Sequence, residues 1–66
     1  MELFNFLITC EDENTNIIVI DAINDDKQIF CGTIAEAYLG ILPSDCHRAV
    51  CRWFVDDNYD FWIFIR

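Results

Sequence analysis

Three polar segments rich in acidic residues divide this chain into short apolar runs. The polar segments are residues 11–16, 21–27 and 56–60, and the stretch 28–55 between the last two is interrupted further by Gly40, Pro43 and charged residues. No uninterrupted apolar run approaches the roughly 20 residues that a membrane-spanning helix needs, so each has the length of a strand or a short helix. The whole chain of 66 residues is the size of one domain, residues 1–66, with a small core.

The first two apolar runs predict a β-hairpin. Residues 3–10 and 17–20 are rich in aromatic and β-branched side chains, and a polar connection joins them. After the second polar segment, residues 28–31 are either another short strand or the lead-in to a helix.

A short helix is expected after residue 33. Thr33 and Glu36 have the spacing of a capping box, in which each side chain accepts a hydrogen bond from the other residue's backbone N–H. Gly40 and Pro43 end the helix, because neither continues it favourably. One apolar stripe of this helix, suited to packing on a sheet, consists of Ile34, Ala37, Tyr38 and Ile41.

The last two apolar runs, residues 49–55 and 61–65, predict a second hairpin around the acidic loop 56–60. A competing interpretation continues a helix from Ser44 to Trp53, so residues 44–52 stay open between strand and helix. The preferred order of elements is ββαββ. This is an α+β fold, with a four-stranded, mainly antiparallel sheet and one short helix on one face.

The N-terminal residues indicate the compartment of the protein. A signal peptide starts with basic residues and continues with apolar ones, whereas this chain starts without a basic residue and carries Glu2 and Asn5. We therefore expect a cytoplasmic protein whose cysteines are reduced, and a strongly acidic surface that anionic membranes repel. The four cysteines are Cys10, Cys31, Cys46 and Cys51.

The motifs for metal binding and catalysis are incomplete. Residues 12–16 and 56–60 match the start of a calcium loop, but neither has the required Gly at position six or Glu at position twelve. Cys46, His47 and Cys51 are potential zinc ligands that lack a second pair. Adjacent residues on an extended chain point apart, so Cys46 and His47 do not predict a nucleophile with its base. We expect no metal, no cofactor and no enzymatic activity.

The net charge excludes one large class of function. Twelve acidic residues against four basic ones give a formal net charge of -8. A surface that binds nucleic acid directly needs Lys and Arg to replace the counterions on phosphates, so no direct nucleic-acid binding is expected. The acidic groups in the three connections are Glu11, Asp12 and Glu13, then Asp21, Asp25 and Asp26, and finally Asp56, Asp57 and Asp60.

The expected topology places these acidic groups at the ends of the sheet. If the helix runs back along the sheet, Asp25 and Asp26 gather with Asp56, Asp57 and Asp60 at one end. The group that contains Glu11, Asp12 and Glu13 then lies at the other end, about 20 Å away for strands of six or seven residues. That separation resembles several phosphate steps along a duplex.

Both faces of the expected sheet are apolar. Phe61, Ile63 and Ile65 alternate with Trp62 and Phe64, so each face of the last strand carries large apolar side chains. One short helix covers only one face of such a sheet. A second copy of the chain, a partner, or the loop at residues 41–47 is expected to cover the other.

The acidic surface, the small size and the lack of a catalytic constellation resemble the small phage-encoded inhibitors that mimic DNA, including anti-CRISPR proteins. This resemblance of type extends over the whole chain. It implies an inhibitor in the host-cell cytoplasm that occupies the DNA channel of a basic DNA-binding protein or a CRISPR effector subunit. Trp62 and Phe64 would add an apolar anchor. The expected partner-binding residues are Asp25, Asp26, Asp56, Asp57 and Asp60, with Glu11, Asp12 and Glu13 at the other end.

A second hypothesis belongs to a different class of protein. The chain would form a homodimeric interaction or regulatory module, with the second sheet face as its interface. Its acidity would then serve solubility alone.

Overall fold

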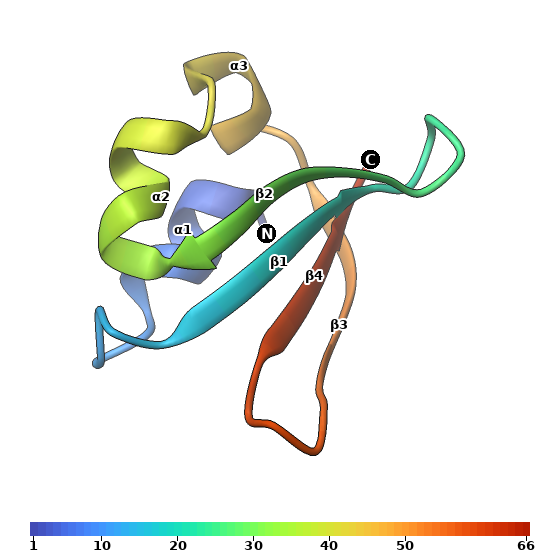
Figure 1. The fold of residues 1–66 in the computed structure, drawn as a ribbon. Coiled ribbons are helices and arrows are strands. Elements are labelled where there is room, and N and C mark those ends of the chain that lie inside the picture. The colour runs from blue at the N-terminus through green and yellow to red at the C-terminus, as the bar shows by residue number, and fades with distance from the viewer.

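The computed structural model describes all 66 residues, which form one four-stranded sheet and three short helices (Figure 1). The elements are α1 (Leu3–Ile8), β1 (Asn16–Asp21), β2 (Lys27–Thr33), α2 (Ile34–Gly40), α3 (Pro43–Cys46), β3 (Val50–Val55) and β4 (Phe61–Ile65). The strands lie in the order β2-β1-β4-β3. The α+β class and the four-stranded sheet are therefore confirmed, and β1, β2, α2, β3 and β4 follow the ββαββ order. Three short helices are present where one was expected, because α1 precedes β1 and α3 follows α2.

The two central strands, β1 and β4, run parallel, whereas each outer strand is antiparallel to its neighbour. Ile17 lies beside Phe61 at one end of the central pair, and Asp21 lies beside Ile65 at the other. Two of the three pairings are thus antiparallel. The parallel one arises because α2 and α3 carry the chain back along the sheet after β2, so that β3 runs in the same direction as β2 and β4 in the same direction as β1.

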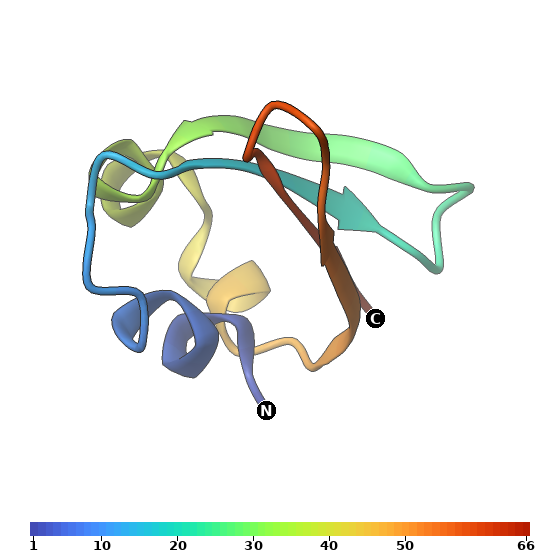
Figure 2. The same ribbon diagram turned by 90° about the horizontal axis from the view of Figure 1, so that it is seen from below.

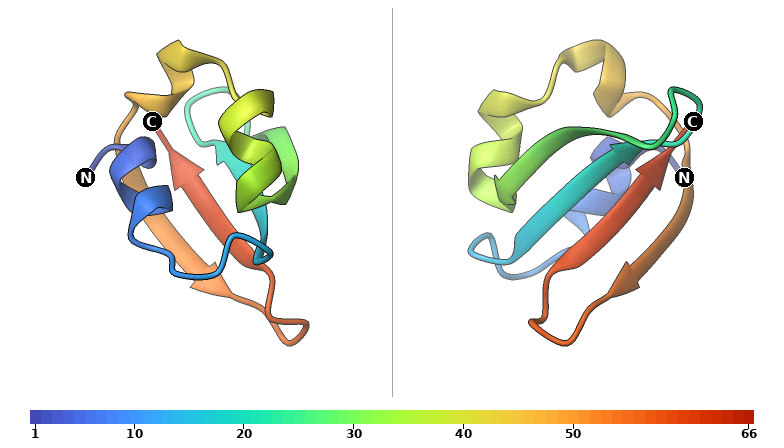
Figure 3. Two further views of the ribbon diagram at one scale, coloured as in Figure 1. Left: turned by 90° about the vertical axis from the view of Figure 1, so that its left-hand side faces the viewer. Right: turned by 45° about the vertical axis from the view of Figure 1, so that its right-hand side comes forward.

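All three helices lie on the same side of the sheet. Figure 2 shows this layer beneath the strands, and the left view of Figure 3 shows α1 and α2 in front of the sheet. The right view of Figure 3 shows the opposite face with no element over it. The core between helices and sheet consists of Leu3, Leu7, Ile17, Val19, Ile34, Ala37, Ile41, Ile63 and Ile65.

The prediction that residues 3–10 form a strand is wrong, because most of this segment is the helix α1. Leu3 and Leu7 are one helical turn apart and fully buried, while Phe6 and Cys10 pack against the same core. These four residues have the i, i+3, i+4, i+7 spacing of an apolar helix face. The fourth strand of the sheet is instead β2, in the segment that the sequence left open between strand and helix.

The capping box predicted for α2 is present. Glu36 donates its backbone N–H to Thr33 Oγ1 at 3.2 Å, and Thr33 donates its own to Glu36 Oε1 at 3.0 Å. At the other end of α2, a Cβ on Gly40 would lie 2.8 Å from the ring of Phe30 in β2, so glycine allows helix and strand to approach.

The competing helix from Ser44 to Trp53 does not form. The helix α3 begins at Pro43 after the N-cap residue Leu42, and β3 begins at Val50. Pro43 suits the first helical turn, where its missing N–H costs no hydrogen bond.

One buried charged residue joins the end of the sheet to the helical layer. Asp21 is 4% exposed, and both terminal guanidinium nitrogens of Arg48 donate to its carboxylate, Nη1 at 3.0 Å to Oδ2. Asn24 Nδ2 donates to the same Oδ2 at 2.6 Å. Arg48 also donates to Asp45 Oδ1 at 3.1 Å. The hydrogen bonds from Arg48, and to a smaller extent the one from Asn24, hold the pKa of the Asp21 carboxyl well below its usual range.

Replacing Asp21 should change how stability depends on pH. Because its folded-state pKa lies below the unfolded value, the stability that it adds is present at neutral pH and is lost as the pH falls below about 4. Asp21→Asn should lower the melting temperature by roughly 10 °C near neutral pH, since Arg48 loses its buried partner.

Thermal unfolding followed by circular dichroism at about pH 7 and about pH 3 measures both effects. Between these two conditions the melting temperature should fall less in Asp21→Asn than in the parent protein. Asp57→Asn removes an exposed carboxylate and is the matched control, which should behave like the parent. Equal pH dependence in the parent and Asp21→Asn would contradict the role given to this pair.

Candidate functional site

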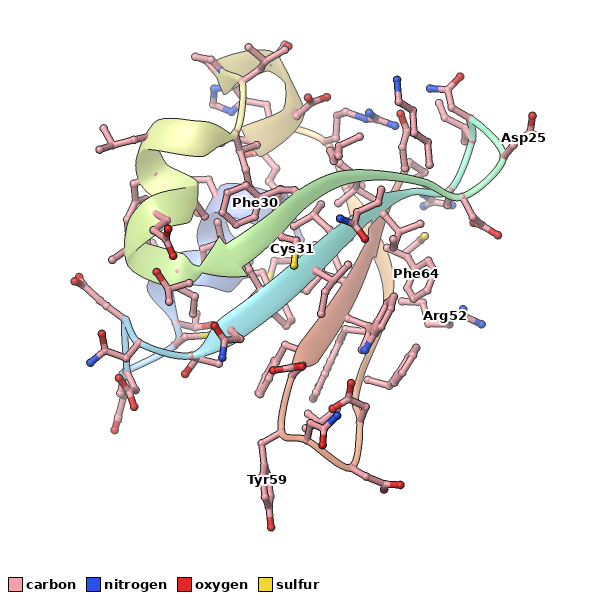
Figure 4. All side chains as sticks on the ribbon, viewed as in Figure 1. Asp25, Phe30, Cys31, Arg52, Tyr59 and Phe64 are labelled. Atoms are coloured by element: carbon pink, nitrogen blue, oxygen red, sulfur yellow. The ribbon has the colours of Figure 1, made fainter.

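The parallel pairing of β1 and β4 places the loop before β4 at the beginning of β1. Loop 56–60 therefore lies at the same end of the sheet as loop 11–15, and the turn that contains Asp25 and Asp26 lies at the opposite end. The expectation that Asp25 and Asp26 gather with Asp56, Asp57 and Asp60 is wrong for this reason. Figure 4 shows Asp25 and Tyr59 at these opposite ends.

We call the end that holds loops 11–15 and 56–60 the acidic end. Loop 11–15 is fastened to the start of α2, because Ala35 N–H donates to Glu13 O and Ile34 N–H donates to Thr15 O, both at 3.1 Å. This contact brings Glu36 to the same end. The acidic end therefore carries seven of the twelve acidic residues, namely Glu11, Asp12, Glu13, Glu36, Asp56, Asp57 and Asp60.

All four basic residues lie in the other half of the molecule. Lys27 lies opposite Asp21 in the pairing of β2 with β1. Arg66 follows Ile65, which lies opposite Asp21 in the pairing of β4 with β1. Arg48 binds Asp21, and Arg52 pairs with Phe64 near the end of β4. We call this half the basic half; it also holds Glu2, Asp21, Asp25, Asp26 and Asp45. Nearly all of the net charge is consequently concentrated at the acidic end.

Asp56 organises the loop between β3 and β4. Its Oδ1 accepts the backbone N–H of Asn58 at 2.9 Å and of Asp60 at 3.0 Å, and its Oδ2 accepts Trp62 Nε1–H at 2.9 Å. The hydrogen bond from Trp62, with those from Asp60 and Asn58, lowers the pKa of Asp56. Asp56, which the sequence predicts to bind a partner, is thus engaged in hydrogen bonds within its own hairpin. It positions the loop, whereas Asp57 and Asp60 are the carboxylates that the loop presents.

The loop 11–15 is held in a similar way. Asn14 N–H donates to Asp12 Oδ1 at 2.9 Å, and Thr15 N–H donates to Asp12 O at 3.1 Å. Glu11 and Glu13 are exposed beside this turn. Both acidic loops therefore use one aspartate for internal hydrogen bonds and present further carboxylates to solvent.

The turn between β1 and β2 has a different local structure. Asp25 and Asp26 have φ angles of 56° and 54°, and Lys27 N–H donates to Asn24 O at 3.2 Å. Two successive left-handed residues closed by this bond are typical of a type I′ hairpin turn. The two carboxylates are exposed, but they lie next to Lys27 in the basic half.

The face of the sheet opposite the helices, which we call the open face, is aromatic at its β3–β4 side. Phe54 stacks on Trp62 at 5.9 Å between ring centroids and on Phe64 at 6.0 Å. The Arg52 guanidinium lies 4.2 Å from the centroid of Phe64. The loop at residues 41–47 does not cover this face, because α3 packs beside α1 on the helical side.

The side chains that bind metals or act as nucleophiles are scattered. The structure contains no group of three or more His, Cys, Asp and Glu residues close enough to hold a metal ion. All four cysteines are free thiols, and burial raises the pKa of Cys10 and Cys46. His47 is exposed, with its Nδ1 lying 3.6 Å from Glu2 Oε2. None of the three helices of the protein is long and apolar enough to cross a membrane.

Comparisons of the chain with protein-family models, with curated proteins and with solved structures found no match.

The strained turn at Asp25 and Asp26 yields a prediction about stability. Asp26→Gly should raise the free energy of unfolding by about 0.5–1 kcal/mol, because glycine adopts positive φ without a steric cost. Urea unfolding measures the change.

Asp26→Ala is the matched control for the lost charge. It removes the same carboxylate but keeps a Cβ at positive φ, so it should not be stabilised. An equal gain in both variants would show that charge, and not backbone conformation, limits the stability of this turn.

Proposed function

We propose that this protein is an acidic inhibitor that occupies the DNA-binding channel of a nucleic-acid-binding protein in place of DNA. The observation that carries the proposal is the acidic end, where seven acidic residues lie without a Lys or Arg among them. The partner is a basic DNA-binding protein, and a CRISPR effector subunit is the partner that the resemblance implies. The inhibitor acts in the host-cell cytoplasm, without a cofactor and without catalysis.

The location of the charge favours a basic partner. Concentrating the negative charge at one end produces a directional negative field, which attracts a basic channel and orients the protein as it approaches. The four basic residues do not interfere, because they lie in the other half.

The shape of the two loops lowers the cost of binding. Asp56 and Asp12 each bind backbone N–H groups of their own loop, so the neighbouring carboxylates are presented in an ordered state. A partner therefore loses less binding free energy to ordering than it would with a flexible acidic tail. The proposed contact residues are Glu11, Asp12, Glu13, Asp57 and Asp60, with Asp56 as a positioning residue.

Asp25 and Asp26 serve as the matched comparison for these contact residues, since they lie at the opposite end of the sheet.

Immobilised protein should capture DNA-binding proteins from a bacterial lysate at about 50 mM NaCl and lose them at about 500 mM. Added duplex DNA should displace them, because both compete for the same basic groups.

Reversing two charges at each end tests the location of the contact. Asp57→Lys with Asp60→Lys should reduce capture by about tenfold or more, whereas Asp25→Lys with Asp26→Lys, which changes the net charge equally, should reduce it much less. Capture that survives high salt, resists DNA, or falls equally with both double variants would refute the proposal.

A further inference from the structure

The edge strand β3 is open to pairing. Trp53, Phe54 and Val55 are 52%, 43% and 42% exposed, and the strand contains one charged residue, Arg52, and no proline. Edge strands of monomeric proteins are usually protected by several charges, by a proline or by a covering segment. This strand lacks most of that protection.

The hydrogen bonds of the sheet show which backbone groups of β3 are free. Asp56 N–H donates to Asp60 O at 3.1 Å, and in an antiparallel ladder such bonded pairs alternate with non-bonded ones. Arg52 and Phe54 therefore direct their N–H and C=O groups toward β4. Trp53 and Val55 direct theirs outward.

The N-terminal residues limit the free edge. Val50 N–H donates to Met1 O at 2.7 Å, and Leu3 N–H donates to Arg48 O at 2.9 Å, so residues 1–3 cover the beginning of β3. The remainder of the strand, with Trp53 and Val55, is left without a neighbour on that side.

We propose that a second copy of this chain pairs with β3 antiparallel, about a twofold axis at Phe54, so that the two sheets become one continuous sheet of eight strands. Trp53 of each copy then exchanges backbone hydrogen bonds with Val55 of the other. Phe54 meets Phe54 across the axis on the open face, and Arg52 stands opposite Asp56 of the second copy. With the axis at Phe54, these pairs follow from the outward direction of Trp53 and Val55.

Charge complementarity selects a second copy in this orientation. Antiparallel pairing places the acidic end of each copy beside the basic half of the other, which holds Arg52, Arg48 and Arg66. A parallel arrangement would bring the two acidic ends together and would be repelled. The interface is also self-complementary, as a twofold axis requires.

Arg52 of one copy and Asp56 of the other are each suited to contact the other across the interface. Arg52 is held over Phe64 and is exposed, so its guanidinium is positioned but has no carboxylate partner in the single chain. Asp56 accepts three hydrogen bonds, and a carboxylate has about four acceptor sites. One site therefore stays available for Arg52 of the second copy.

The inference does not rest on the proposed inhibitor function, since it uses the edge of the sheet and not a foreign partner. In the dimer, loop 11–15 of each copy stays exposed, because it lies before β1 and away from β3, whereas loop 56–60 lies beside Arg52 of the second copy. Light scattering measures the dimer without any DNA-binding protein present, so failure of the dimer and failure of capture are distinguishable.

The mass in solution tests the dimer. Multi-angle light scattering should give twice 7.8 kDa for the parent chain. Val55→Lys introduces a charge at the paired edge and should raise the dimer dissociation constant by about tenfold or more.

Leu39→Lys is the matched control, because Leu39 is 94% exposed on α2, far from β3, and the substitution adds the same charge. It should leave the dimer intact. Circular dichroism should show that both variants are folded. A parent chain that stays monomeric, or equal masses for both variants, would overturn the proposal.

Hydrogen exchange identifies the edge directly. The Trp53 and Val55 amides should become protected as the protein concentration rises, whereas the Arg52 and Phe54 amides should be protected at every concentration by their bonds to β4. A dimer in which the Trp53 and Val55 amides exchange freely would pair through another surface and would contradict this assignment.

Discussion

The parallel pairing of β1 with β4 determines where every charged group of this protein lies. These strands form the centre of the sheet, and their side chains Ile17, Val19, Ile63 and Ile65 are fully buried beneath the helices. The register of so apolar a centre is strongly constrained, because a shift by one residue would exchange the two faces. Once β1 and β4 point the same way, loops 11–15 and 56–60 must share one end and the turn at Asp25 must occupy the other.

The two ends consequently differ in chemistry. At one end, Arg48 neutralises the buried Asp21 and links β1 to α3 and the C-terminal residue, whose carbonyl also accepts from Arg48 at 3.5 Å. At the other, carboxylates are exposed without basic neighbours, and water and salt reduce their mutual repulsion. The two contacts proposed above, with a basic surface at the acidic end and with an antiparallel copy along β3, both use this polarity.

Much of the fold follows from local sequence patterns. Thr33 and Glu36 predict the start of α2, and the last hairpin is evident from its two apolar runs, because both signals depend on residues close in the chain. The segment from Leu3 to Cys10 satisfies both a β-rich composition and a helical spacing, and only burial of Leu3 and Leu7 against β1 and β4 selects the helix. The acidic residues at the sheet ends could be identified individually. Their grouping could not, since it depends on a pairing between strands some forty residues apart. The bond from Trp62 to Asp56 depends in the same way on the loop geometry.

Nuclear Overhauser contacts between the central strands test the parallel pairing of β1 and β4 most directly. Parallel strands give contacts between backbone protons of Ile17 and Phe61 at one end of β1 and between those of Asp21 and Ile65 at the other. Contacts between Ile17 and Ile65 instead would mean that β4 runs antiparallel to β1. The acidic loops would then lie at opposite ends, and the charge separation on which both proposals depend would not exist.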